Sequence, residues 1–257
     1  MTTENVTQHK SFLNSMTILG LLLAIGMASA AFILGVQAKR AVAGQQSITV
    51  KGLAEKPVKA DSAEWFVSLG ATDVTQRGAL EKLGVERKVL QKFLTEQGLP
   101  QETWSFDTEV INDHYEEVFV GDTPRQVRKG FDAAQSLRVA SKDLAAIAKA
   151  NQAILQLRAD NHPITSQPPQ YLVSSLEEVK MSLIADATKN ARSRATEFVK
   201  QDGVKVGVMK SASQGAFYIL PVGGSNEDTD NSYGGVYDKS TVNKTARVVV
   251  TIVYNIE

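Results

Sequence analysis

The sequence predicts an α+β fold, a largely antiparallel sheet with three helices packed on it, preceded by a single N-terminal transmembrane helix. Three observations predict it. Residues 17–36 carry no charged side chain. Further along, segments that alternate apolar and polar residues, as half-buried strands do, are interleaved with three segments of helical period. Several of those strands are joined by hairpin-like connections, which favours antiparallel pairing with helices against one face of the sheet.

Charge and cysteine content limit the functions to be considered. The chain has 257 residues, with 28 Lys and Arg against 28 Asp and Glu, and it contains no cysteine. Nucleic-acid binding relies on a basic surface, so the balanced charge predicts no nucleic-acid partner. The absence of cysteine excludes disulfides and thiolate catalysis. The residues after the first forty suffice for one large domain or two small ones.

The first element is expected to lie in a membrane. Thr17–Val36 reads TILGLLLAIGMASAAFILGV. Twenty helical residues that rise about 1.5 Å each span about 30 Å, the thickness of the hydrocarbon core. A cleaved signal peptide is the alternative, because Ala28-Ser29-Ala30 and Ala41-Val42-Ala43 both resemble a signal peptidase site. The uncleaved anchor is favoured, because the apolar run exceeds the roughly 7–15 residues of a usual signal core.

Four segments follow from this interpretation. They are a cytoplasmic N-terminal tail (1–16), a transmembrane anchor or signal peptide (17–36), a linker (37–46) and a globular domain (47–257). Charge alone does not set the orientation, because Lys10 precedes the apolar run whereas Lys39 and Arg40 follow it.

The globular part is predicted to begin with strands. In Ser47–Gly52, Ile48 and Val50 alternate with polar residues, and Pro57 predicts a bend or a sheet edge beyond them. Other strands are expected over Ala63–Gly70, Trp104–Val110 and Phe131–Val139, with a hairpin connection over His114–Arg125 and a short strand over Gln167–Val173.

Two helices are predicted among these strands. The first covers Asp73–Gln97, with Asp73 as its N-cap and Gly98 as its stop signal. The second begins at Ser141 and ends at His162-Pro163.

The longest helix begins near Ser174 and is the central element of the predicted fold. One face carries small or apolar residues at helical spacing: Leu176, Val179, Leu183, Ala187, Ala191, Ala195 and Phe198. Its alanines allow the helix axis to lie close to a sheet. Gly203 is placed to end the helix in a left-handed conformation, and the valines after it predict another strand.

The C-terminal part is predicted to contain a long loop and a central strand. Gln214–Tyr237 is rich in Gly, Asn, Asp and Ser, and its apolar island, Phe217–Val222, is expected to reach an adjacent subunit or else its own core. Thr245–Ile256 is apolar on both faces, which predicts a strand in the interior of the sheet.

Three segments resemble the SIMPL-domain family, which includes periplasmic immunogenic and oxidative-stress-defence proteins of bacteria. ITVKGLAEKPVKAD (48–61) resembles the opening strand of the family, although Lys51 replaces a small residue. LIADATKNARSRATEFVKQDGVKVG (183–207) resembles its alanine-spaced helix, and ARVVVTIVYNI (246–256) its closing strand. The resemblance covers Ser47–Glu257. It implies an α+β domain, export and ring-like or channel-like homo-oligomers, and it transfers no catalytic residue.

No catalytic, cofactor-binding or metal-binding residue is predicted. His9, His114 and His162 are isolated from one another, so solvated or capping roles are expected for them. Five carboxylates near the third strand are expected on a solvated face: Asp107, Glu109, Asp113, Glu116 and Glu117.

Two further patterns allow a functional interpretation besides a structural one. Asp228 and Asp230 have the spacing of a calcium loop, but Tyr233 replaces the required Gly and Lys239 the bidentate Glu, so a surface loop is favoured. A basic stripe follows the outer side of the long helix: Lys189, Arg192, Arg194 and Lys200. It either faces water or contacts anionic lipid or an acidic neighbouring subunit.

The leading hypothesis is a non-enzymatic, membrane-tethered protein that forms homo-oligomers and contributes to envelope or oxidative-stress tolerance. It would cross the bacterial inner membrane once, contact lipid through residues 17–36 and hold its globular domain in the periplasm. The stress role comes from the family resemblance alone. The alternative is a periplasmic small-ligand-binding module whose cleft is lined by Trp65, Trp104, Phe217 and Tyr218. A hydrolase would require folding to bring histidines and carboxylates together.

Overall fold

The computed structural model describes residues 4–43, 46–121, 123–224 and 235–257. The contacts divide the chain into two compact units. The first unit contains Met1–Leu53, Asp186–Gly215 and Val249–Glu257, and the second contains Ala54–Ala185 and Ala216–Val248. Each is considered by itself below.

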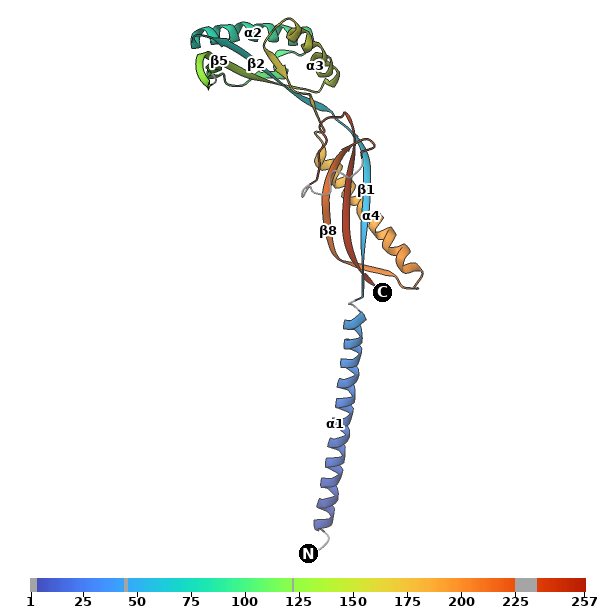
Figure 1. Cartoon of the computed structure of the whole chain (residues 1–257). Helices are drawn as coiled ribbons and strands as arrows, with labels where there is room; N and C mark the ends of the chain where they lie inside the picture. Colours follow the sequence, from blue (N-terminus) through green and yellow to red (C-terminus); the bar gives the residue numbers. More distant parts are fainter. Residues whose placement is uncertain (1–3, 44–45, 122, 225–234) are drawn as a thin grey trace. The chain divides into compact units, whose positions relative to one another are not determined.

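The described residues form four α-helices, one 3-10 helix and nine strands (Figure 1). In chain order they are α1 Glu4–Ala43, β1 Ser47–Lys59, β2 Ser62–Asp73, α2 Gln76–Glu96, η1 Gln101–Thr103, β3 Trp104–Phe106, β4 Val110–Val120, β5 Thr123–Ser141, α3 Leu144–Ala159, β6 Ile164–Ser166, β7 Gln170–Leu172, α4 Leu176–Lys200, β8 Val206–Pro221 and β9 Asn243–Ile256.

Helix α1 contains the predicted membrane segment. Within it, Met16–Gln37 has a mean hydropathy of 2.4 and no buried residue, so its length and composition suit a membrane span. A signal sequence meets the same criteria. The helix also includes residues 38–43, which belong to the predicted linker.

A six-stranded antiparallel sheet forms the framework of the second unit. Its strand order is β3-β5-β2-β6, with β4 also paired to β5 and β7 to β2. Alternate residues of β2, namely Trp65, Val67 and Leu69, are buried, because α2 and α3 pack on this sheet. Thr75, rather than the predicted Asp73, caps α2, since its side chain accepts a hydrogen bond from the Gly78 N–H.

Strands β1, β9 and β8 form a second sheet, in that order. The sequence therefore correctly predicts that the last strand is an interior one. In the first unit, α4 lies very close to β1. A Cβ atom added to Gly52 would lie 2.0 Å from the Ala187 carbonyl oxygen and 2.8 Å from Ala191 Cβ. Glycine on the strand and alanines on the helix together permit this approach.

The structure confirms an α+β fold with antiparallel pairing and an N-terminal apolar helix. It corrects the single sheet covered by three helices, because the described residues form four helices and two sheets. The reason is the short break at Ala60-Asp61. Strand β1 ends there, and β2 begins directly afterwards in the other sheet.

One prediction about burial and one about secondary structure are wrong. Phe198 is 66% exposed, and Val199 is buried in its place, because the buried positions of α4 repeat every fourth residue from Leu183. The island Phe217–Val222 is not on a loop, since it lies in or directly after β8. Ile219 and Leu220 are 2% and 4% exposed, and the Ile219 N–H donates to Val236 O, so this part of the island packs within its own subunit, which was the second predicted alternative. Val222 is 66% exposed.

Candidate functional site

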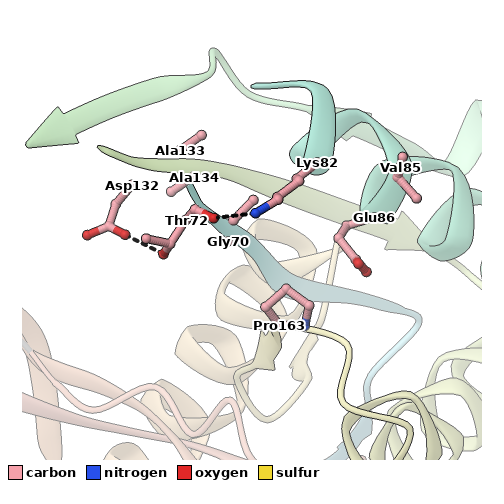
Figure 2. A pocket seen from close by; sticks show the side chains of 10 residues that line it. Gly70, Thr72, Lys82, Val85, Glu86, Asp132, Ala133, Ala134 and Pro163 are labelled. Carbon is pink, nitrogen blue, oxygen red and sulfur yellow. Dashed lines mark hydrogen bonds between the residues drawn. The ribbon is translucent and has the colours of Figure 1, made fainter. Parts of the chain in front are cut away.

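The second unit contains an open cavity of about 480 Å³ (Figure 2). Its lining residues come from β2, α2, β5 and the segment before β6: Gly70, Ala71, Thr72, Lys82, Val85, Glu86, Asp132, Ala133, Ala134 and Pro163.

The cavity lies beside the last residues of β2, which pair with β5 but not with β6. Strand β6 pairs with β2 only from Val67 to Leu69, and Gly70 N then donates to Pro163 O at 2.9 Å. Helix α2 contributes Lys82 and Glu86, which lie four residues apart and therefore on one helix face. On the strands, Gly70 pairs with Ala134 and Ala71 with Ala133. These small residues leave room for a ligand.

Lys82 is the cation of the cavity. Its Nζ lies 2.8 Å from Asp73 Oδ2 and donates to Thr72 O at 3.1 Å. The hydrogen bond from Lys82, with one from the Thr75 N–H, lowers the pKa of Asp73 to about 2. Lys82 therefore faces a permanent carboxylate at physiological pH.

A second polar group joins β2, β4 and β5. Thr72 Oγ1 donates to Asp132 Oδ1 at 2.5 Å, and Asp132 Oδ2 lies 2.8 Å from His114 Nδ1. The hydrogen bonds from Thr72 and His114 lower the pKa of Asp132, and the bond to Asp132 raises the pKa of His114. His114 Nε2 also lies 3.6 Å from Glu116 Oε1.

A third polar group consists of His162 and Glu86, whose Nδ1 and Oε2 atoms lie 2.7 Å apart. The fold thus brings His114 and His162 each to a carboxylate. The sequence does not predict these pairs, because the partners are far apart in it. The Thr72 hydroxyl donates to Asp132 and not to an imidazole.

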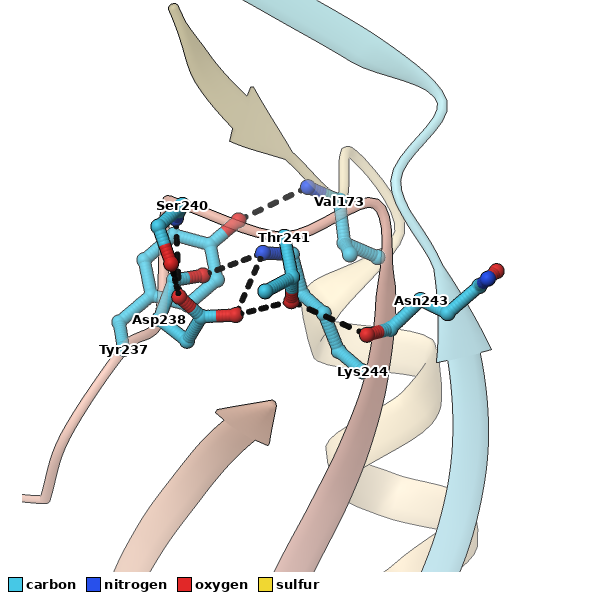
Figure 3. A network of polar contacts seen from close by, with 7 residues as sticks. All are labelled: Val173, Tyr237, Asp238, Ser240, Thr241, Asn243 and Lys244. Carbon is cyan, nitrogen blue, oxygen red and sulfur yellow. Dashed lines mark hydrogen bonds and ion pairs between the residues drawn. The ribbon is translucent and has the colours of Figure 1, made fainter. Parts of the chain in front are cut away.

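Among the described residues, the most deeply buried charged side chain is that of Lys244, whose polar contacts Figure 3 shows. Its side chain is 0% exposed, and its Nζ donates to Asp238 O at 2.5 Å and to Asp238 Oδ2 at 3.2 Å. The ammonium also lies 6.0 Å from the ring centroid of Tyr237, whose hydroxyl accepts a hydrogen bond from Val173 N. The network fixes the segment that leads into β9.

Both carboxylate oxygens of Asp238 accept hydrogen bonds. Ser240 donates to Oδ1 through both its backbone N–H and its hydroxyl, while the Thr241 hydroxyl donates to Oδ2. Burial alone raises the pKa of Asp238, but the hydrogen bonds from Thr241, Ser240 and Lys244 outweigh it and hold the pKa well below its usual range. Asp238 is therefore a carboxylate at neutral pH, and its hydrogen bonds hold residues 238–244 together.

Sequence reasoning missed Lys244, although a signal was present. Position 244 is in phase with Ala246, Val248 and Val250, the buried face of β9. A lysine in that phase predicts a buried ammonium that needs an acid nearby.

The four aromatic residues predicted to line a cleft do not line this cavity. Trp65 is fully buried in the core, and its Nε1 donates to Gln167 O at 2.9 Å. Trp104 packs edge-on against Phe106 beside that core. Phe217 and Tyr218 are half-buried residues of β8.

The five predicted surface carboxylates are exposed, as expected: Asp107, Glu109, Asp113, Glu116 and Glu117. Some of them form ion pairs. Glu109 contacts Arg87, and Asp113 Oδ1 lies 3.4 Å from Arg128 Nη1.

The basic stripe on α4 is exposed, but its two arginines also bind backbone. Arg194 donates to Lys51 O of β1 at 3.1 Å. Arg192 donates to Val206 O and Gly207 O, both at 3.4 Å, and lies over the Tyr254 ring. Lys189 and Lys200 form ion pairs within the helix, with Asp186 and Glu197.

Among the described residues, no three His, Asp or Glu side chains gather as metal ligands do. Asp228, Asp230 and Tyr233 of the calcium-like pattern lie outside the described residues, and so does the side chain of His9.

The comparisons with known proteins point to one family. A family model described as "SIMPL: Protein of unknown function (DUF541)" matches residues 48–254. A search of curated proteins found no match.

Similar solved structures resemble the chain only remotely. "De novo designed protein Foldit4" is 12% identical, covers 43% of this chain and 99% of its own, and has a TM-score of 0.24. An amidase of the hydantoinase/carbamoylase family from Burkholderia phymatum is 11% identical, with coverages of 51% and 32% and a TM-score of 0.25. An uncharacterized conserved protein from Listeria innocua is 11% identical, with coverages of 76% and 91% and a TM-score of 0.18. Scores this low carry no functional argument.

Proposed function

Because the chain belongs to the SIMPL (DUF541) family, we propose that it is a membrane-tethered, non-enzymatic envelope protein that forms homo-oligomers. The observation that carries the proposal is α1. Its apolar stretch, Met16–Gln37, is fully exposed, and a surface of this kind is stable only in lipid. In this proposal the helix crosses the bacterial inner membrane once, and residues 47–257 lie in the periplasm.

Carbonate washing of membranes tests the tether. The full chain should stay in the membrane fraction, and N-terminal sequencing should find the apolar stretch intact. A soluble product that begins near Ala31 or Gly44 would show instead that a signal peptide had been removed.

Two edge strands support the homo-oligomer. Strands β1 and β8 are the edges of their sheet, and residues 208–215 of β8 are exposed. Unpaired edges can add strands from another chain, and tethering in one membrane raises the local concentration of copies. Sedimentation of the detergent-extracted protein should give a species larger than the 27.8 kDa monomer. A monomer across the micromolar range would contradict this part.

The stress role and the absence of catalysis can be tested together. A strain that lacks the gene should lose peroxide tolerance and regain it when the full chain is expressed. Asp132→Asn and His114→Gln should restore tolerance as well as the unchanged protein, because these residues have no catalytic role in the proposal. Failure of both well-folded variants would contradict the non-enzymatic interpretation, whereas failure of Asp132→Asn alone would favour a role of the cavity that Asp132 lines.

A small-ligand-binding module is the second candidate, and the cavity beside β2 favours it. The cavity combines a floor of small apolar residues with the polar side chains of Lys82, Glu86 and Asp132. Ala134→Trp fills that space from an exposed position on β5, and Ala185→Trp adds the same side chain to an exposed position on α4. Native mass spectrometry of the purified protein should detect a bound small molecule, which only Ala134→Trp removes. No bound mass in the unchanged protein would count against this candidate.

A further inference from the structure

The end of the second sheet lies close to the end of the membrane helix. The apolar stretch ends at Gln37, α1 continues to Ala43, and Gln46 O already accepts a hydrogen bond from Ile256 N at 3.2 Å. Six helical residues rise about 9 Å, and three extended residues reach about 10 Å at most. The sheet therefore begins within about 20 Å of the hydrocarbon core.

The C-terminal half of α4 lies at this same end of the sheet. Gly52 of β1 faces Ala187 and Ala191, whereas Thr49, Val50 and Lys51 share an open cavity of about 510 Å³ with Arg194, Glu197 and Phe198. The N-terminal end of β1, nearest Gln46, thus lies beside the C-terminal end of α4. The segment after α4 reaches that end as well, because Lys205 and Glu257 exchange two backbone hydrogen bonds of 2.7 and 2.8 Å.

The side chains there suit a lipid surface. Phe198 is 66% exposed, whereas Val199 and Leu183 of the same helix are buried. In the segments that meet at this end of the sheet, 46–51, 192–207 and 254–257, basic side chains outnumber acidic ones: Lys51, Arg192, Arg194, Lys200 and Lys205 against Glu197, Asp202 and Glu257. An aromatic ring surrounded by basic side chains is typical of residues that anchor proteins at the boundary between water and lipid.

We propose that Lys51, Arg194, Phe198, Lys200 and Lys205 form a headgroup surface, which docks on the phospholipid headgroups of the bilayer that holds α1. The proposal rests on the proposed membrane tether. In it, Phe198 inserts among the headgroups, and the basic side chains contact lipid phosphates. Docking then holds the first unit against the bilayer. The unit therefore does not rotate freely about the short connection between α1 and β1.

A fluorescent label on the full chain tests the proposal. The chain has no cysteine, so Phe198→Cys provides a single labelling position on an exposed side chain. Lys189→Cys is the matched control, because it is exposed on the same helix and lies about 13 Å further from its C-terminal end. Both proteins are reconstituted in phosphatidylcholine vesicles that contain phosphatidylglycerol and a lipid with a nitroxide quencher on its headgroup.

The label at position 198 should be quenched several-fold more than the label at position 189. Vesicles without phosphatidylglycerol, or the changes Lys200→Glu and Lys205→Glu in the Phe198→Cys protein, should reduce that difference. Equal quenching at the two positions would overturn the proposal. The proposal would also be overturned if the label at position 198 were protected from the quencher, and only at high protein-to-lipid ratios. That result would mean that a second copy of the chain covers the surface.

The tether is measured separately on the same vesicles. Protein that floats with the vesicles after a carbonate wash retains its membrane helix, whatever the label reports. Flotation without quenching at position 198 overturns the headgroup surface alone, whereas loss of the protein from the vesicles overturns the proposed tether.

Discussion

Lys244 and Asp238 form an ion pair with almost no access to solvent, since their side chains are 0% and 8% exposed. A buried ammonium that loses its counter-charge destabilises a fold far more than a surface charge does. We therefore expect Asp238→Asn to lower the free energy of unfolding by about 3–5 kcal/mol, as measured by urea denaturation.

Glu177→Gln is the control for this substitution. It removes the acid from the exposed Lys180–Glu177 pair, where Nζ and Oε1 are 3.9 Å apart, and should cost less than about 1 kcal/mol. Similar losses for the two variants would mean that Lys244 reaches water once Asp238 is neutral.

The His114–Asp132 pair predicts a pH dependence. Its hydrogen bond raises the pKa of His114 above the usual 6.5 and lowers the pKa of Asp132 below the usual 3.8. The contribution of His114 to stability is thus complete below pH 6.5 and disappears as the pH rises through its folded pKa. The contribution of Asp132 is complete above pH 3.8 and disappears as the pH falls through its folded pKa.

The pair therefore stabilises the protein most between pH 3.8 and 6.5. In an NMR titration, the His114 midpoint should exceed 6.5 in the unchanged protein and move down in Asp132→Asn. An unchanged midpoint in that variant would show that the two groups do not interact in solution.

At the level of elements, the contact of β1 with α4 depends on the absence of a side chain at Gly52. Its added Cβ would meet the Ala187 carbonyl oxygen at 2.0 Å, and a backbone atom cannot rotate away. We expect Gly52→Ala to force the helix outward and to lower the denaturation midpoint, at a cost of about 1–3 kcal/mol.

Gly84→Ala makes the same chemical change where space is available. A Cβ at Gly84 in α2 would have no neighbour within 4 Å, and alanine favours a helix interior by about 1 kcal/mol over glycine. This variant should be at least as stable as the unchanged protein. Equal destabilisation by both substitutions would contradict the close approach at Gly52.

Periodicity predicted the elements whose burial is regular. The alanine face of α4 and the apolar pattern of β9 can be recognised in the sequence, because the buried positions of each element recur at regular intervals along it. The start of β8 was predicted from the valines after Gly203, but its later part was assigned to a loop, because residues 208–215 are exposed on both faces and no alternation marks them. The predicted strand over Trp104–Val110 is interrupted between β3 and β4, where the Gln135 side chain binds Asp107 O.

At the level of the whole molecule, the proposed membrane insertion of α1 depends on the uniform apolarity of Met16–Gln37. Leu23 lies near the middle of Met16–Gln37. An arginine there costs about 3 kcal/mol on insertion scales, so Leu23→Arg should shift the protein out of the carbonate-resistant membrane fraction.

Leu155→Arg provides the control, because Leu155 is an exposed leucine of α3. It makes the same substitution outside the proposed membrane segment and should leave the distribution between fractions unchanged. Membrane association that survives Leu23→Arg would assign the attachment to another part of the chain.

The candidate cavity could not be predicted from the sequence, because it forms only after distant segments meet. Lys82 and Glu86 come from α2, Asp132 from β5 and Pro163 from the segment before β6. None of these residues has a motif around it. Their proximity depends on how far β6 extends along β2, and residue types alone do not encode that length.

The strand order β1-β9-β8 also has a consequence for how the protein is made. The buried cluster around Trp65 draws its residues from positions 63–164, so it can form while the rest of the chain is still being synthesised. Strand β1 must wait, because its partner β9 follows all the other described strands in the sequence. Closing so long a loop is entropically unfavourable and slow. In the proposed tethered protein, β1 stays unpaired beside the membrane during that interval, and a chaperone that binds extended segments should act there first.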